Sequence, residues 1–80
     1  MSARTDPASE ARALMRGHRW FSPFLQLEAM RAVCSIELLE RRGDSHGADV
    51  WLIALRLDLS RDRTLRTLTG QVLPTTGSSI

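Results

Sequence analysis

The sequence predicts a small all-α domain of three to four helices, with a helix-turn-helix-like pair at its C-terminal end. Two proline-led start signals and one long amphipathic segment predict the helices. Of the 80 residues, 42% are apolar and 25% are charged, which are ordinary values for a globular chain. We therefore expect one domain over 6–70, a disordered segment at 1–5 and a flexible tail at 71–80.

A short helix is predicted near the N-terminus. Asp6 followed by Pro7 is typical of an N-cap and a first helical position, and Gly17 marks the end of the helix. Only Leu14 and Met15 offer substantial apolar surface in this segment. We expect this helix to be short and weakly packed.

A long amphipathic helix over 23–42 is the clearest element. Ser22 and Pro23 supply its start signal, and Gly43 suits the position just after its end. One apolar stripe runs along the helix at spacings of three and four residues. The stripe is expected to be core, or alternatively a seam between the helices of a dimer. Its members are Leu27, Met30, Cys34 and Leu38.

The stretch 48–70 admits two structures. Apolar residues at every second position are typical of a strand, which leaves α+β with a C-terminal β-hairpin as the alternative fold. Leucine, alanine and arginine favour a helix instead. The three-residue spacing of Leu65 and Leu68 would also place them on opposite faces of a strand.

The helical interpretation gives two consecutive helices, at 48–58 and 61–69. Ser60 is expected to cap the second helix, and Gly70 is expected to end it. The long helix 23–42 would support this pair.

Residues 54–66, ALRLDLSRDRTLR, resemble the helix-turn-helix of DNA-binding regulators. The shared features are a small residue in the first helix, apolar anchors before the turn and a serine that caps the second helix. Asp58 stands where such domains favour glycine. The resemblance implies that the second helix meets DNA in the major groove.

The second helix of the pair carries the candidate nucleic-acid contacts. At about 100° per residue, Leu65 and Leu68 point one way and the arginines point roughly opposite. Arginine forks suit phosphates and guanine edges, so these residues are predicted to face DNA. The candidates are Arg61, Arg63, Arg66 and Thr67.

Three of the four aromatic residues form a second candidate surface. They are Trp20, Phe21 and Phe24. Tryptophan is enriched at the centres of protein interfaces, so the cluster is a candidate partner-binding site. Packing within the core is the alternative, because a small domain needs large side chains inside.

Several functional classes find no support in the sequence. Cys34 is the only cysteine, which excludes a disulfide framework and a thiolate metal cluster. No glycine-rich phosphate loop or nucleophile–base pattern is present, so we expect no enzyme, no cofactor, no metal and no small-molecule substrate. The longest apolar run, 50–55, is too short to span a bilayer, and a cytoplasmic prokaryotic protein without a membrane partner is expected.

The sequence therefore predicts transcription regulation by one of two routes. In the first, a helix-turn-helix domain binds DNA, as a homodimer because one small module offers limited contact area. In the second, the domain is an antiactivator or inhibitor that binds a DNA-binding regulatory protein. The net charge of only +2 and an acidic middle segment favour the second route.

Overall fold

The computed structural model describes the backbone of residues 6–78 and the side chains of residues 6–69. Within these residues it contains three α-helices and no strand. The helices are α1 (Pro7–Gly17), α2 (Pro23–Arg41) and α3 (Ser45–Ser78). The all-α prediction is confirmed, and the β-hairpin alternative is wrong.

Helices α1 and α2 begin where the sequence predicts. The carboxylate of Asp6 accepts a hydrogen bond from the Ser9 amide at 3.4 Å, with Pro7 as the first helical residue. Likewise, the Ser22 hydroxyl accepts from the Leu25 amide at 3.3 Å. Gly43 follows α2 with a φ of 79°, a backbone conformation that glycine adopts without strain.

The predicted helix-turn-helix pair does not form, because α3 runs without interruption through residues 58–61. Ser60 lies inside this helix, where its carbonyl accepts a hydrogen bond from the Thr64 hydroxyl at 3.1 Å. The reason is local: the leucines, alanine and arginines before Ser60 favour continued helix, and no glycine or proline interrupts them. Asp44 caps α3 instead, accepting from the Gly47 amide at 2.9 Å.

Helix α3 also continues past Gly70, so the predicted stop at that residue is wrong. The segment predicted as a tail, 71–80, begins inside α3. Residues 1–5 and 79–80 lie outside the described residues.

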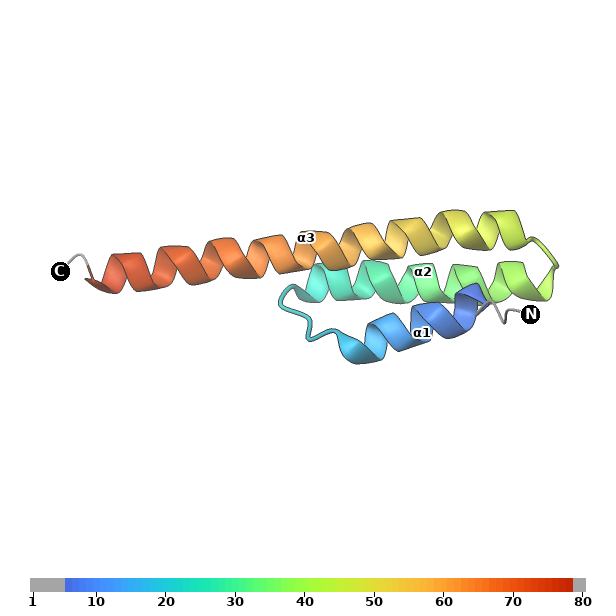
Figure 1. The fold of residues 1–80 in the computed structure, drawn as a ribbon, viewed down its shortest axis with the longest axis horizontal. Helices are drawn as coiled ribbons and strands as arrows, with labels where there is room; N and C mark the ends of the chain where they lie inside the picture. The colour runs from blue at the N-terminus through green and yellow to red at the C-terminus, as the bar shows by residue number, and fades with distance from the viewer. Residues whose placement is uncertain (1–5, 79–80) are drawn as a thin grey trace, which may run out of the picture.

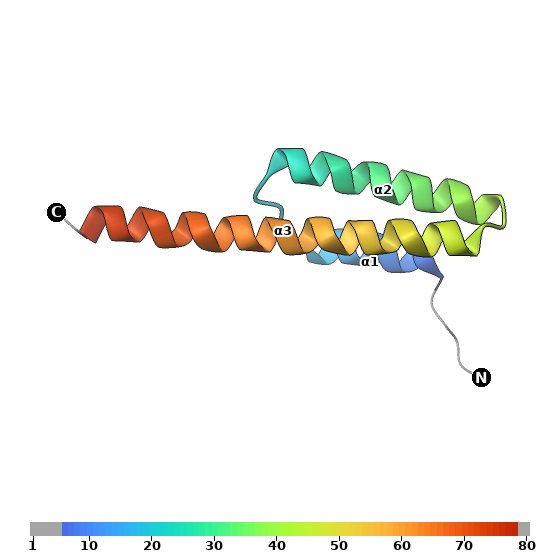
Figure 2. The same cartoon turned by 90° about the horizontal axis from the view of Figure 1, so that it is seen from above.

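Helices α2 and α3 form an antiparallel hairpin, and α1 lies along one side of it (Figures 1 and 2). The buried positions of both long helices are spaced alternately by four and three residues, as in a coiled coil. We call these positions the seam: Leu25, Ala29, Ala32 and Ile36 on α2, and Ala48, Leu52, Leu55, Leu59 and Asp62 on α3.

The predicted α2 stripe is not the core. Leu27, Met30, Cys34 and Leu38 are all exposed. The seam lies on the opposite side of the helix and uses smaller residues, because alanines allow the backbones of α2 and α3 to approach closely. Ala8 and Ala11 of α1 are buried against the same core.

Helix α3 is the longest element, and Figures 1 and 2 show its C-terminal part extending beyond the loop between α1 and α2. The longest dimension of the molecule is accordingly 58 Å, against 27 and 17 Å for the others. None of the helices in the described part of the chain is apolar enough over sufficient length to cross a membrane.

Candidate functional site

Asp62 forms a buried polar junction between α3 and the loop that joins α1 to α2. Its Oδ1 accepts a hydrogen bond from the Ser22 amide at 2.8 Å. Its Oδ2 accepts from the Phe21 amide at 2.9 Å and lies 2.8 Å from His18 Nε2. Asp62 is fully buried, so this carboxylate fixes the start of α2 against α3.

The electrostatics of the junction favour the ionised carboxylate. Burial by itself would raise the pKa of Asp62, but hydrogen bonds from the Phe21 amide, His18 and the Ser22 amide lower it below its ordinary value. Every oxygen of the carboxylate is occupied by a donor of this chain. The junction therefore acts as an internal clamp.

This cluster was not predicted from the sequence, although one signal was present. The α3 seam positions Leu55 and Leu59 are followed three residues later by Asp62. A charged residue at the next seam position indicates a buried carboxylate that needs partners. Those partners come from the loop some forty positions earlier, which the local sequence pattern did not reveal.

The three candidate partner-binding aromatics are separated by the structure. Trp20 is half-buried against the core and meets His18 edge to face, with ring centroids 4.5 Å apart. Its indole Nε1 is buried and has no hydrogen-bond acceptor among the described residues. Phe21 and Phe24 are exposed, and 68% of Phe24 is accessible.

The four candidate nucleic-acid contacts are all exposed but do not form one surface. Arg61 lines a hollow with Phe24 and Leu65, whereas Arg63 and Thr67 line a different one. The Arg66 guanidinium is used internally, because it donates a hydrogen bond to the Arg19 carbonyl.

The predicted apolar back of this segment is also wrong. Leu65 and Leu68 are exposed and do not hold α3 to the domain. Leu59 and Asp62 perform that role from the seam. The buried side of this segment differs from the predicted one because the helix is continuous. Without a turn at residue 60, the spacing of the buried seam positions continues from Leu59 to Asp62.

Two outward faces carry most of the exposed large apolar side chains among residues 6–69. The α2 outer face consists of Leu27, Met30, Cys34 and Leu38. The α3 outer face consists of Val50, Ile53 and Leu57, with exposed fractions of 50%, 60% and 53%. At about 100° per residue, both faces point away from the seam. Each long helix is thus apolar on two opposite sides, which is typical of helices that are covered on both.

An apolar hollow adjoins the α2 outer face where α1 packs against it. Met15, Val33 and Cys34 line this hollow, together with Met30 and the arginines at positions 12 and 16. Its volume is about 370 Å³. The hollow widens the apolar surface of α2 toward α1.

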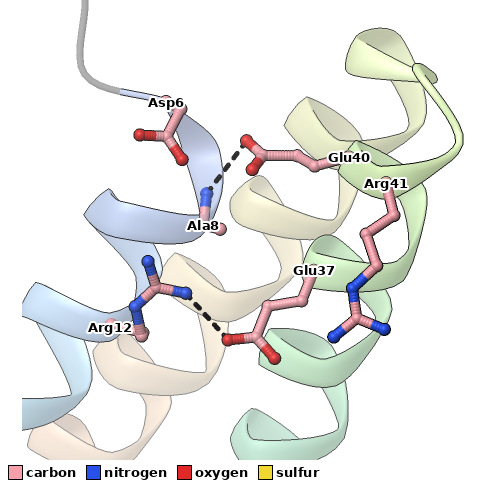
Figure 3. Close-up of a pocket in the computed structure, with 6 residues that line it drawn as sticks. All are labelled: Asp6, Ala8, Arg12, Glu37, Glu40 and Arg41. Carbon is pink, nitrogen blue, oxygen red and sulfur yellow. Dashed lines mark hydrogen bonds and ion pairs between the residues drawn. The ribbon is translucent and has the colours of Figure 1, made fainter.

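A second hollow, at the start of α1, is polar (Figure 3). Glu40 accepts a hydrogen bond from the Ala8 amide at 3.1 Å, and Glu37 pairs with Arg12 at 2.8 Å. Both carboxylates lie on α2 and hold α1 in place, as the dashed lines of Figure 3 show. Because donors of this chain already bind both carboxylates, the hollow is part of the contact between α1 and α2.

Metal ligands do not converge in the described part of the chain: no group of three or more His, Cys, Asp or Glu side chains gathers there. Comparison with known proteins adds no assignment, since no family model, curated protein or solved structure matches the chain.

Proposed function

We propose that this domain is a non-enzymatic regulatory protein that acts by protein–protein contact, and that its partner presents an amphipathic helix to the α3 outer face. The supporting observation is the exposure of Val50, Ile53 and Leu57 on one uninterrupted helix. Large apolar side chains gathered on one face mark an interaction surface, and a helix laid along such a stripe is a recurrent mode of recognition.

The α3 outer face is free for a partner because the fold does not need it. Packing of α3 against α2 and α1 uses Ala48, Leu52, Leu55 and Leu59, on the opposite side of the helix. The proposed partner therefore adds a layer to the bundle without displacing one.

The charges along α3 suggest the chemistry of the partner. Arg61 lies exposed four residues beyond Leu57, and therefore on the same side of α3 as the apolar stripe. A partner helix with apolar residues at spacings of three and four, and acidic residues toward one end, complements this surface. We propose that such a partner is a DNA-binding regulator, which this domain inhibits by occupying one of its helices.

The test compares two triple variants. One carries Val50→Ser, Ile53→Ser and Leu57→Ser on α3. The matched control carries Leu27→Ser, Met30→Ser and Leu38→Ser on α2. Proteins captured from the native host by the tagged wild-type chain are identified, purified and titrated by calorimetry against all three forms.

We expect the α3 variant to bind its purified partner at least about 100-fold more weakly, because three apolar contacts are lost together. The α2 variant should bind like the wild type. Equal affinity for all three forms, loss only with the α2 variant, or no saturable binding by any captured protein would each overturn the proposal. Circular dichroism of each variant verifies that the helices remain.

DNA contact is the second candidate function, supported by the exposure of Arg61, Arg63 and Thr67. Backbone phosphate contacts lose affinity steeply with salt, so fluorescence anisotropy of a mixed-sequence duplex is measured at about 50 mM and about 200 mM salt. The variant is Arg61→Ala with Arg63→Ala, since Arg66 serves the fold. Micromolar binding at low salt that this double variant abolishes would favour DNA contact over the protein partner.

A further inference from the structure

We propose that the hollow between α1 and α3 binds a small phosphomonoester, held by His18 and Arg63. Both residues line this hollow, whose volume of about 320 Å³ is near the lower end of the range for ligand pockets. The sequence does not predict the site, because the two residues are far apart in the chain. The hollow adjoins the buried seam residue Leu59 and not the α3 outer face, so the inference goes beyond the proposed function.

His18 holds one ring nitrogen on Asp62 and leaves the other open. Its Nε2 lies 2.8 Å from Asp62 Oδ2, whereas Nδ1 has no hydrogen-bond partner among the described residues. Among residues 6–69, the only buried side-chain nitrogen or oxygen without a partner is Trp20 Nε1. Nδ1 is therefore reached by solvent, although only 9% of the His18 side chain is exposed. The ring is thus fixed in place, with a single open position in the hollow.

The contact with Asp62 determines which hydrogen bond Nδ1 can make. An ionised carboxylate only accepts, so the Nε2 of a neutral His18 carries the ring proton and Nδ1 has a lone pair. A neutral ring therefore accepts a hydrogen bond at Nδ1, and a protonated ring donates one. A phosphomonoester suits both forms, because its second proton dissociates at a pH near 6. A carboxylate has no such proton at neutral pH.

Arg63 supplies the positive charge that complements a phosphate. It is exposed, and among residues 6–69 no carboxylate pairs with it. Guanidinium groups bind phosphate through two parallel hydrogen bonds, so the donors of Arg63 fit this ligand. Glu10 also lies on the rim of the hollow, but its carboxylate is paired with Arg56. This ion pair reduces the repulsion between Glu10 and an anion.

The rest of the hollow favours an ester with an apolar body over free phosphate. Leu59 of α3 and Leu14 of α1 contribute apolar side chains to its lining. On α1, Ala13 is small and Gly17 has no side chain, which leaves room for a ligand beside the helix. A ring placed against this lining would be removed from water, and affinity would rise with the apolar area that is buried. The ligand class is therefore a phosphate group on a small apolar body.

NMR of the histidine rings tests the site in the wild-type chain, because His18 and His46 are the only histidines. Phenyl phosphate is titrated at about pH 7 while nitrogen–proton correlation spectra record both rings. We expect a saturable shift of His18 Nδ1, with a dissociation constant of about 1 mM or lower, and no change at His46. No saturable shift up to about 10 mM ligand, or equal shifts of both rings, would overturn the proposal.

Two further ligands separate a phosphomonoester from other anions. Phenyl sulfate has the same ring but no second proton, and it should bind at least about 10-fold more weakly than phenyl phosphate. Inorganic phosphate lacks the ring and should bind at least about 3-fold more weakly. If phenyl sulfate bound as tightly as phenyl phosphate, the hollow would be a general anion site and the proposed ligand would be wrong. Equal affinity for inorganic phosphate would overturn the assignment of an apolar body.

Three substitutions outside the buried core test the residues that form the site. Arg63→Gln should weaken binding of phenyl phosphate at least about 10-fold. Arg16→Gln is the matched control, because it removes the same charge from the hollow on the other side of α1, and it should change the affinity less than about 2-fold. Ala13→Met fills the hollow from an exposed position and should also weaken binding about 10-fold. Equal effects of the two arginine substitutions, or unchanged binding by Ala13→Met, would contradict the proposal.

Discussion

The two sides of α2 differ in a way that its composition does not suggest. The seam side carries Leu25, Ile36 and two alanines, and it is almost entirely buried. The outer side carries Leu27, Met30, Cys34 and Leu38, which are larger on average, and it is exposed. Burial on this helix therefore follows the closeness of approach to α3 rather than the size of the apolar residues. The second and third predictions test this difference, and the first and fourth concern carboxylates of α3 in or beside the seam.

The largest effect is expected where the seam becomes polar. Asp62→Ala removes the acceptor for the Phe21 and Ser22 amides and for His18, and leaves these partly buried groups unpaired. We expect a loss of about 3–5 kcal/mol in the free energy of unfolding, measured by urea denaturation. Asp62→Asn is the control, since it retains one acceptor oxygen and should lose less. A loss under about 1 kcal/mol would show that the junction does not clamp the bundle.

Truncation of equivalent side chains should separate the two sides of α2. Ile36→Ala opens a cavity in the seam and should cost about 2–5 kcal/mol. Leu38→Ala, on the outer face, should cost under about 0.5 kcal/mol. Thermal and urea unfolding followed by circular dichroism provide the measurement. Similar costs at both positions would contradict the assignment of the seam.

Enlarging a side chain on each side of α2 tests the same difference in the opposite direction, with a smaller expected effect on stability. Ala32→Leu inserts volume between two closely approaching helices and should destabilise the domain by about 1–3 kcal/mol. Cys34→Leu adds similar bulk on the exposed side and should be neutral within about 0.5 kcal/mol. If Ala32→Leu were neutral, close approach of the backbones would not explain the use of alanine in the seam.

The smallest effect concerns charge beside the seam. Partial burial raises the pKa of Asp58; Arg61 lowers it and Glu28 raises it further, with a net shift above its ordinary value of 3.8. The ionised form therefore destabilises the fold, and Asp58→Asn should stabilise it by up to about 0.5 kcal/mol at neutral pH. This gain should shrink as the pH falls below the raised pKa and vanish below the ordinary value of 3.8.

Asp62 provides the comparison for this pH profile, because the pKa of Asp62 is lowered. Its stabilisation is complete above the ordinary value of 3.8 and is lost as the pH falls through the lowered pKa. Denaturation curves of wild type and Asp58→Asn between about pH 3 and pH 7 measure both effects. A gain from Asp58→Asn that persisted at the acid end would contradict the assigned cause.

Local signals predicted part of this fold. Asp6-Pro7 and Ser22-Pro23 identified the starts of α1 and α2, and Gly43 the end of α2, because caps depend on neighbouring residues. The hydrophobic pattern misled in two places. The large apolar residues of α2 led to the prediction that the exposed side of this helix is the core. Ser60 led to the prediction of a helix cap at a position where α3 continues.

Less of the candidate site than of the fold could be predicted from the sequence. The exposure of Arg61 and Arg63 agrees with the prediction, whereas the internal use of Arg66 depends on the Arg19 carbonyl, far away in the chain. The outer faces became recognisable only once the seam was known, because a helix that is apolar on two sides does not reveal which side its own domain covers.

The clamp at Asp62 has a consequence for the order in which the molecule opens. The amides of Phe21 and Ser22 belong to a short loop, where exchange with solvent is ordinarily fast. Here their acceptor is a carboxylate at the centre of α3, which is released only when α3 separates from α2. These two loop amides should therefore exchange as slowly as the interior of the helices, and they report on separation of the whole hairpin.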